Sequence, residues 1–219
     1  MSDLFIPPRA FFTFTFRCPY LTAAPRLNGH LRDWPKAALL PDLHSMEHRK
    51  SFADVYLGWD ETGLYCAASV DQKTQYHIDP SQYTKSDCLE LWIDTRDLKD
   101  IHRGNRYCHH FYFLPGGSGR DGRQPIGRQI RLPLANEQAP PCPEDSLRVG
   151  LRRLKRGYRL ELKIPAEGLN GFEPGEFDRL GFNYVLRDTQ KGTQSWSAGT
   201  DLPVETDPSL WGTVELVRD

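Results

Sequence analysis

The sequence lacks the features that membrane and nucleic-acid-binding proteins need. No stretch approaches the roughly 20 consecutive apolar residues of a membrane helix, and the apolar segment 11–16 is interrupted by two threonines. Lys plus Arg number 28 and Asp plus Glu number 29, so the formal net charge is -1. Because no excess of positive charge is present to attract phosphates or anionic lipid, we predict neither a nucleic-acid nor a membrane partner.

CxxC spacing is also missing, and the pattern of a signal peptide is not recognised in the first residues. The 5 cysteines are scattered, with no CxxC spacing, which disfavours a disulfide framework and a structural zinc site. Cys66 and Cys88 lie in apolar runs and are expected to be small buried hydrophobes. The first residues, MSDLFIPPR, show no basic start followed by a long apolar stretch, so no signal peptide is predicted. These observations favour a reducing compartment, and we expect a cytoplasmic protein.

Helical periodicity is scarce, whereas short runs of alternating apolar and polar residues recur along the whole chain. Such alternation is typical of half-buried strands, and about nine of them separated by turn residues favour an all-β sandwich or barrel. One helical turn is expected at 165–169, and long loops at 115–128 and 136–145. We expect a single domain over residues 1–219. The expected strands are 12–16, 54–59, 64–70, 88–94, 110–114, 147–151, 158–164, 180–187 and 213–217.

Several short motifs occur in one order along the chain. The segment 25–34 reads PRLNGHLRDW, 55–65 reads VYLGWDETGLY, and 86–94 reads SDCLELWID. Further on, 157–165 reads GYRLELKIP and 207–212 reads DPSLWG. Their order resembles that of the family-9 carbohydrate-binding modules. The resemblance implies an antiparallel β-sandwich of the jelly-roll-like, DOMON-like kind, a lectin-like role on sugars, and in many members structural calcium.

Three of the expected strands place chemically suitable side chains on one face. Alternate residues of a strand share a face, so Leu89, Leu91 and Ile93 are expected in the core and the residues between them on the opposite side. An aromatic ring can stack on a pyranose, and charged or amide groups can bind its hydroxyls. If the strands are neighbours, the predicted sugar-binding surface contains Glu90, Trp92, His110, Tyr112, Asn183 and Arg187.

The resemblance assigns a role to one of these positions, and at other sugar-binding positions of the family this chain has a different residue. Glu90 matches the motif glutamate whose carboxylate contacts sugar in family members. Tyr112 falls where some members carry a sugar-contacting Arg, and Val185 where some carry Gln. Glu205 falls near the position of a stacking Trp, and Tyr83 is the candidate to replace one wall of an aromatic sandwich.

We predict a non-catalytic module that recognises a sugar or oligosaccharide. Glu90 and Asp94 share a face but lie roughly 13 Å apart along a strand, beyond the roughly 5–9.5 Å of glycosidase carboxylate pairs. A glutamate beside Trp92 can also simply pair with Arg187 across the sheet, and Trp92 can lie beneath a loop as second-layer core. Trp34, Trp59 and Trp211 are expected in the core, and Trp196 is undecided.

The sequence is also compatible with two other functions and with a bound calcium ion. A protein-interaction sandwich that has lost the sugar site would explain the missing aromatic walls. A DOMON-like haem or redox domain uses Met, His or Lys as axial ligands; the only methionines are Met1 and Met46, and Met46 lies in a polar segment with His44 and His48. Calcium, a possible structural cofactor, has the turn carboxylates as weak candidate ligands; these are Asp60, Asp71 and Asp87.

Overall fold

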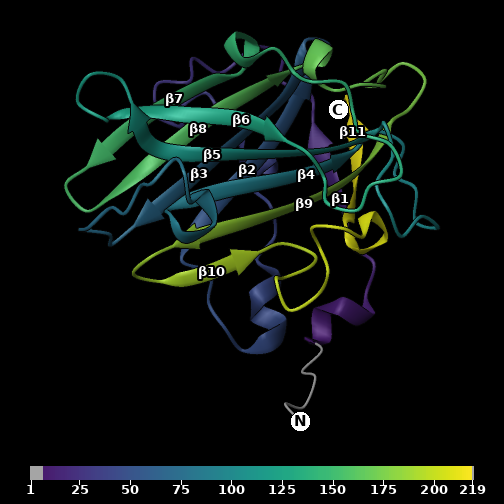
Figure 1. Ribbon diagram of the computed structural model, residues 1–219, viewed down its shortest axis with the longest axis horizontal. Helices are drawn as coiled ribbons and strands as arrows, with labels where there is room; N and C mark the ends of the chain where they lie inside the picture. The colour runs from purple at the N-terminus through teal and green to yellow at the C-terminus, as the bar shows by residue number, and fades with distance from the viewer. Residues whose placement is uncertain (1–6, 219) are drawn as a thin grey trace.

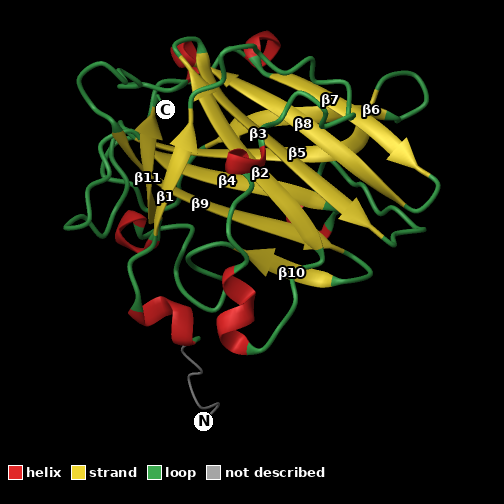
Figure 2. Ribbon diagram, turned by 180° about the vertical axis from the view of Figure 1, so that it is seen from behind, coloured by secondary structure: helices red, strands yellow, loops and turns green. Residues whose placement is uncertain are grey.

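Two β-sheets pack face to face and form a sandwich, seen from opposite sides in Figures 1 and 2. The structure is a computed structural model that describes residues 7–218. The larger sheet, sheet A, has seven strands in the order β1-β11-β9-β4-β5-β6, with β10 paired to β9. Its strands are β1 (Thr15–Pro19), β4 (Cys88–Asp94), β5 (Cys108–Ser118), β6 (Gln124–Ile130), β9 (Arg179–Asp188), β10 (Gly192–Ser195) and β11 (Gly212–Val217).

The smaller sheet, sheet B, has four antiparallel strands in the order β2-β3-β8-β7. Neighbouring pairs in sheet A are antiparallel as well, except β1 with β11, which run parallel. The all-β sandwich expected from the sequence is therefore confirmed. The strands of sheet B are β2 (Ala53–Asp60), β3 (Gly63–Asp71), β7 (Arg148–Leu154) and β8 (Gly157–Pro165).

The core lies between the sheets and follows the period of the strands. Leu91, Phe111 and Phe182 of sheet A belong to one buried cluster with Leu57 and Leu162 of sheet B. Each such side chain, fully buried, stabilises the fold by about 2 kcal/mol relative to exposure. Trp59 (1% exposed) lies in this core as expected, whereas Trp211 and Trp34 are buried in two smaller apolar clusters. Trp196, undecided from the sequence, also belongs to the core.

The expected strands differ from the observed ones in three places. β1 begins at Thr15, later than expected, because the preceding residues form the short helix η1 and its exit. The expected loop 115–128 is wrong, since most of it belongs to the β5–β6 hairpin, with a register shift between Leu114 and Ser118. The polar composition that suggested a loop reflects the edge position of β6, where every residue is at least partly exposed. The short strand β10 was not expected at all.

The remaining described structure is irregular or 3-10 helical. The expected helical turn is present as η6, and 136–145 is an irregular segment ending in η5, as expected. None of the helices within residues 7–218 has the length and apolar character needed to cross a bilayer. The 3-10 helices are η1 (Pro8–Phe11), η2 (Lys36–Ala38), η3 (Leu43–Glu47), η4 (Tyr83–Lys85), η5 (Glu144–Ser146), η6 (Ala166–Gly168) and η7 (Pro208–Leu210).

Candidate functional site

The predicted strands are neighbours, so the predicted side chains do gather on one face. β4 lies between β5 and β9, with Glu90 opposite Tyr112 on one side and Val185 on the other. Trp92 lies between His110 and Asn183 in the same way. Because the residues between them point into the core, this set lies on the outer face of sheet A, the face turned away from sheet B.

The carboxylate of Glu90 is at the centre of this outer face and is completely buried. Its Oε1 accepts a hydrogen bond from Nε of Arg187 at 2.8 Å, and its Oε2 lies 3.1 Å from Nε2 of His110. A buried charge is tolerated only when it is paired and hydrogen-bonded, and both oxygens meet that condition here. The interpretation that Glu90 pairs across the sheet with Arg187 is confirmed.

Trp92 is covered and does not offer an open stacking surface. Its side chain is fully buried, and its ring stacks on that of His110 with centroids 4.3 Å apart and planes at 22°. Segments that follow β6 and β10 supply the cover. Its apolar neighbours are Cys108, Leu132, Val185, Ala198, Val204 and Trp211. The structure therefore corrects the expectation that Trp92 contacts a sugar directly, because loops distant in sequence close over it.

Asn183 is likewise buried, and its side-chain amide holds the segment after β10. Its Oδ1 accepts hydrogen bonds from the backbone N–H groups of Ser197 at 3.0 Å and Ala198 at 3.3 Å. Its Nδ2 donates to the carbonyl oxygen of Ala198 at 2.9 Å. The amide thus holds a loop over the sheet, and none of the residue is exposed to solvent. The expectation of a sugar contact at Asn183 is corrected in the same way as that at Trp92.

A second covered patch surrounds the two tyrosines. The rings of Tyr83 and Tyr112 stack with centroids 4.4 Å apart and planes at 8°. Tyr112 is buried, whereas Tyr83, in η4, keeps partial exposure. Burial, together with the negative charges of Glu90 and Glu205, raises the pKa of Tyr83 to about 12. Its phenol therefore stays protonated and can donate a hydrogen bond at physiological pH.

Three partly exposed polar side chains lie close together beside these covered patches, and we call them the outer mouth: Arg187, Glu205 and Tyr83. The Arg187 side chain is 17% exposed and that of Glu205 47%. Nη2 of Arg187 lies 4.0 Å from Oε1 of Glu205, which places the loop after β10 beside β9 (Figure 1). The sequence had placed Glu205 only as the substitute for a stacking Trp, so its pairing with Arg187 was not foreseen.

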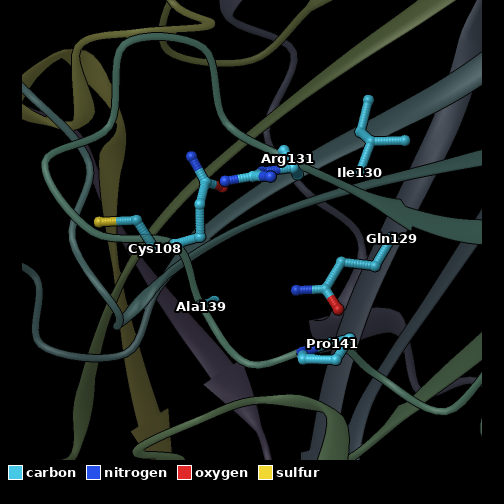
Figure 3. A pocket seen from close by; sticks show the side chains of 7 residues that line it. Cys108, Gln129, Ile130, Arg131, Ala139 and Pro141 are labelled. Atoms are coloured by element: carbon cyan, nitrogen blue, oxygen red, sulfur yellow. The ribbon is translucent and has the colours of Figure 1, made fainter.

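A separate cavity of about 350 Å³ lies at the β6 edge of sheet A (Figure 3). It contains none of the predicted sugar-binding residues, although Ile130 in its wall pairs with His110. The amide of Gln129 is already engaged with Cys142 and Pro140. The residues that line this cavity are Cys108, Gln129, Ile130, Arg131, Gln138, Ala139 and Pro141.

One trio of side chains has the composition of a hydrolase triad but the wrong geometry. Oγ of Ser209 lies 3.2 Å from Nδ1 of His102, and Oδ2 of Asp207 lies 3.1 Å from the same nitrogen. A relay requires the serine and the acid on opposite nitrogens of the imidazole ring. Asp207 instead caps η7 by accepting a hydrogen bond from the Ser209 N–H at 3.0 Å.

The turn carboxylates suggested for calcium do not fit that ion. Oδ1 of Asp87 accepts a hydrogen bond from Nζ of Lys73 at 2.9 Å, and the same ammonium lies 3.1 Å from Asp188. Asp60 accepts hydrogen bonds from Thr62 and Tyr65. Asp71 lies on the surface at the end of β3. Within residues 7–218 no group of three or more potential metal-ligating side chains comes together.

The residues suggested as haem ligands are engaged or dispersed. His44 is buried in η3, and its Nε2 lies 3.1 Å from both the backbone nitrogen and oxygen of Ser195. His48 follows that helix in a left-handed conformation, with φ of 55°. An imidazole nitrogen already used in this way is a poor axial ligand.

Known proteins resemble this chain both in sequence and in fold. The model of the family described as "Carbohydrate family 9 binding domain-like" matches residues 34–219. The chain therefore belongs to the family-9 carbohydrate-binding modules, and the resemblance seen in its motifs is confirmed. The matched range begins at Trp34, so the rest of the first motif lies outside it. A comparison with curated protein sequences finds no significant match.

Solved structures share the fold at low sequence identity. A family-9 module from Caldicellulosiruptor kristjanssonii in complex with cellotriose has 15% identity and a TM-score of 0.64, with 94% of this chain and 95% of that one covered. The same kind of module in complex with glucose has 14% identity and a TM-score of 0.57, covering 94% and 97%. A carbohydrate-binding protein described as putative, from Bacteroides uniformis, has 14% identity and a TM-score of 0.55, covering 93% and 98%.

Proposed function

We propose that this protein binds a sugar or short oligosaccharide at the outer mouth and does not transform it. The observation that carries the proposal is the orientation of Arg187. Its Nε is held by the buried carboxylate of Glu90, while the side chain still reaches solvent. A guanidinium held in this way presents its terminal amino groups in a fixed direction, which favours charge-assisted hydrogen bonds to hydroxyl or carboxylate oxygens.

The other mouth residues supply complementary groups. The carboxylate of Glu205 accepts hydrogen bonds from hydroxyls, and the protonated phenol of Tyr83 can donate or accept one. Beneath them, Glu90 and His110 orient Arg187 without touching the ligand. Trp92 and Asn183 keep the covering loop in place. The sugars named for the structural relatives, cellotriose and glucose, are the first ligands to test.

The mouth differs from a pair of aromatic walls around one sugar. Where the family resemblance implies aromatic stacking, this chain has Glu205 on one side and Tyr83, stacked on Tyr112, on the other. We infer that recognition depends on polar contacts more than on stacking. Because aromatic stacking on a sugar face is largely lost, we expect modest affinity and a strong dependence on hydroxyl stereochemistry.

Binding without catalysis is supported by the state of the carboxylates. Glu90 is sealed between Arg187 and His110, and both oxygens of Asp94 accept backbone hydrogen bonds, from Arg96 at 3.0 Å and Leu98 at 2.8 Å. Hydrolysis requires one carboxyl group to protonate a leaving oxygen and another to act on the opposite side of the sugar. Neither carboxylate is placed to reach a ligand at the outer mouth.

Isothermal titration calorimetry with cellotriose and glucose tests the proposal. We expect Arg187→Met and Glu205→Gln each to weaken binding by about tenfold, the value of one charge-assisted hydrogen bond. The matched control is Arg120→Gln, which changes an exposed arginine in the β5–β6 turn. Unchanged affinity in both mouth variants, each shown to be folded at the temperature of the titration, would place sugar binding elsewhere. Product formation on incubation would contradict the absence of catalysis.

A protein-interaction role is the second candidate, and the covered outer face favours it. Trp92, Asn183 and Glu90 are all fully buried, which is the arrangement expected of a sandwich that has lost an open sugar site. This reading predicts no heat of binding for any mono- or oligosaccharide. The calorimetric series therefore separates the two functions.

A further inference from the structure

A larger hollow lies away from the outer mouth, along the free edge of sheet A. β1 is the last strand of sheet A there and its only partner strand is β11, while Tyr20, directly after β1, forms an isolated parallel bridge with Trp59 of β2. A groove of about 810 Å³ runs beside it, between β1 and the segments 20–23 and 32–37. This volume falls in the upper part of the range of roughly 300–1,000 Å³ that is usual for ligand sites. None of the mouth residues lines it.

Two aromatic residues in the groove wall are held firmly. The hydroxyl of Tyr20 donates to the carboxylate of Glu61, and its ring packs edge-on against Trp59 with centroids 5.1 Å apart. Nε1 of Trp34 donates to Oε1 of Glu161 at 2.9 Å. Tyr20 is partly exposed, whereas Trp34 contributes only its 8% exposed edge. Rings fixed in this way cost little conformational entropy when a ligand packs against them.

The charge of the groove is positive. Arg17 and Arg32 both line it, with Asp33 as the acidic member. Asp33 is already paired with Arg26, whose Nε lies 3.0 Å from Oδ2. Arg32 is exposed and has no carboxylate within ion-pair distance among residues 7–218. The groove therefore presents a guanidinium that can still take a carboxylate in the bidentate geometry arginine favours.

The same edge is poorly suited to an added peptide strand. The N–H of Tyr20 donates to the carbonyl of Val217 on the β11 side, so by alternation the backbone of Pro19 faces the groove. Proline has no N–H to donate, and prolines at sheet edges prevent strand addition. A ligand recognised through side chains, not through a continuous backbone ladder, fits this edge better.

We propose that the groove is a second saccharide site and that it takes a short oligosaccharide carrying a carboxylate, that is, one containing a uronic acid. Arg32 binds the carboxylate, the face of Tyr20 that Arg218 leaves uncovered packs against the apolar face of a sugar ring, and Thr22 is within the wall to bind a hydroxyl. The site is independent of the outer mouth. Sugar binding at the outer mouth and binding in the groove can therefore be tested independently.

Trigalacturonate and cellotriose, each titrated into the full chain by calorimetry, test this site. Arg32→Gln should weaken trigalacturonate binding by about tenfold. Ala37→Trp, which places bulk in the groove at an exposed position without removing a contact, should weaken it at least as much. The control Arg120→Gln and the mouth variant Arg187→Met should leave it unchanged. Chemical-shift changes should appear at Trp34 Nε1 and at residues 16–23.

Several outcomes would overturn the proposal. One is no binding of trigalacturonate to the wild-type chain. Another is binding of trigalacturonate to Arg32→Gln and to Ala37→Trp with the same affinity as to the wild-type chain. A third is an equal loss in Arg120→Gln, which would show general attraction between the acidic sugar and surface arginines. Loss of trigalacturonate binding in Arg187→Met but not in Arg32→Gln would assign acidic sugars to the outer mouth instead.

Discussion

Arg187 and Glu90 lie on adjacent strands and form an ion pair in which the carboxylate is fully buried while the guanidinium reaches the surface, with Nε and Oε1 2.8 Å apart. Removing the cation from a buried pair leaves an uncompensated charge. Arg187→Met should therefore lower the free energy of unfolding by roughly 3 kcal/mol. Glu90→Leu with Arg187→Met together should cost less than the sum of the two single changes. Urea denaturation of the four proteins measures this coupling; simple additivity would show that the pair is not coupled.

Lys73 is the most deeply buried cation among the described residues, with its side chain 0% exposed between Asp87 and Asp188. Lys73→Met should lower the free energy of unfolding by roughly 3–5 kcal/mol, because two buried carboxylates lose their counter-charge. Adding Asp188→Asn to that variant should recover part of the loss, although the same change lowers the stability of the wild type. Lys50→Met, at an exposed lysine, is the control for thermal and urea unfolding. A loss no larger than that of the control would refute the role given to Lys73.

Asn183 fixes the loop that covers Trp92 through bonds to Ser197 and Ala198. Asn183→Ala should lower the free energy of unfolding by about 1–3 kcal/mol, since it leaves buried backbone groups unpaired. Amide hydrogen exchange should speed up at residues 197–198 more than in β4. Asn183→Asp keeps the acceptor but not the donor to Ala198, so exchange at 197–198 should remain slower than in Asn183→Ala. Equal exchange in all three proteins would mean that the loop is held by its apolar contacts.

His109 makes stability sensitive to acid. It lies on the inner side of β5, and burial lowers its pKa to about 4 in the folded protein, against roughly 6.5 in an unfolded chain. The neutral imidazole is favoured by folding, so its contribution is complete above pH 6.5 and is lost as the pH falls towards 4. The loss amounts to roughly 3 kcal/mol.

Urea unfolding of His109→Gln between pH 7 and pH 4 checks this expectation. The variant should lose less stability over that interval than the wild type does. His77→Gln, at an exposed histidine, should keep the wild-type slope. The carboxylates titrate in all three proteins and therefore cancel in the comparison. Parallel slopes in the wild type and His109→Gln would show that His109 is not the acid-sensitive group.

The sequence by itself determined which side chains share a face. Strand alternation is a local property of the backbone, so the placement of Glu90, Trp92 and Arg187 opposite the core residues could be read from spacing. The order of the motifs over most of the chain indicated the family as well. The β5–β6 hairpin was not predicted, because an edge strand with one open side tolerates the polar and glycine-rich residues that usually mark loops.

Only the tertiary structure decided which of those side chains remain accessible. Trp92 and Asn183 are covered by segments near residues 132 and 198–204, far from them in sequence, and no local pattern records such contacts. The same holds for Lys73, which meets Asp188 across 115 positions because β3 and β9 end close together. Burial depends on the packing of distant segments. For that reason only the folded structure shows that, of the predicted surface, Arg187 and Tyr83 stay partly exposed, and that Glu205 lies beside them.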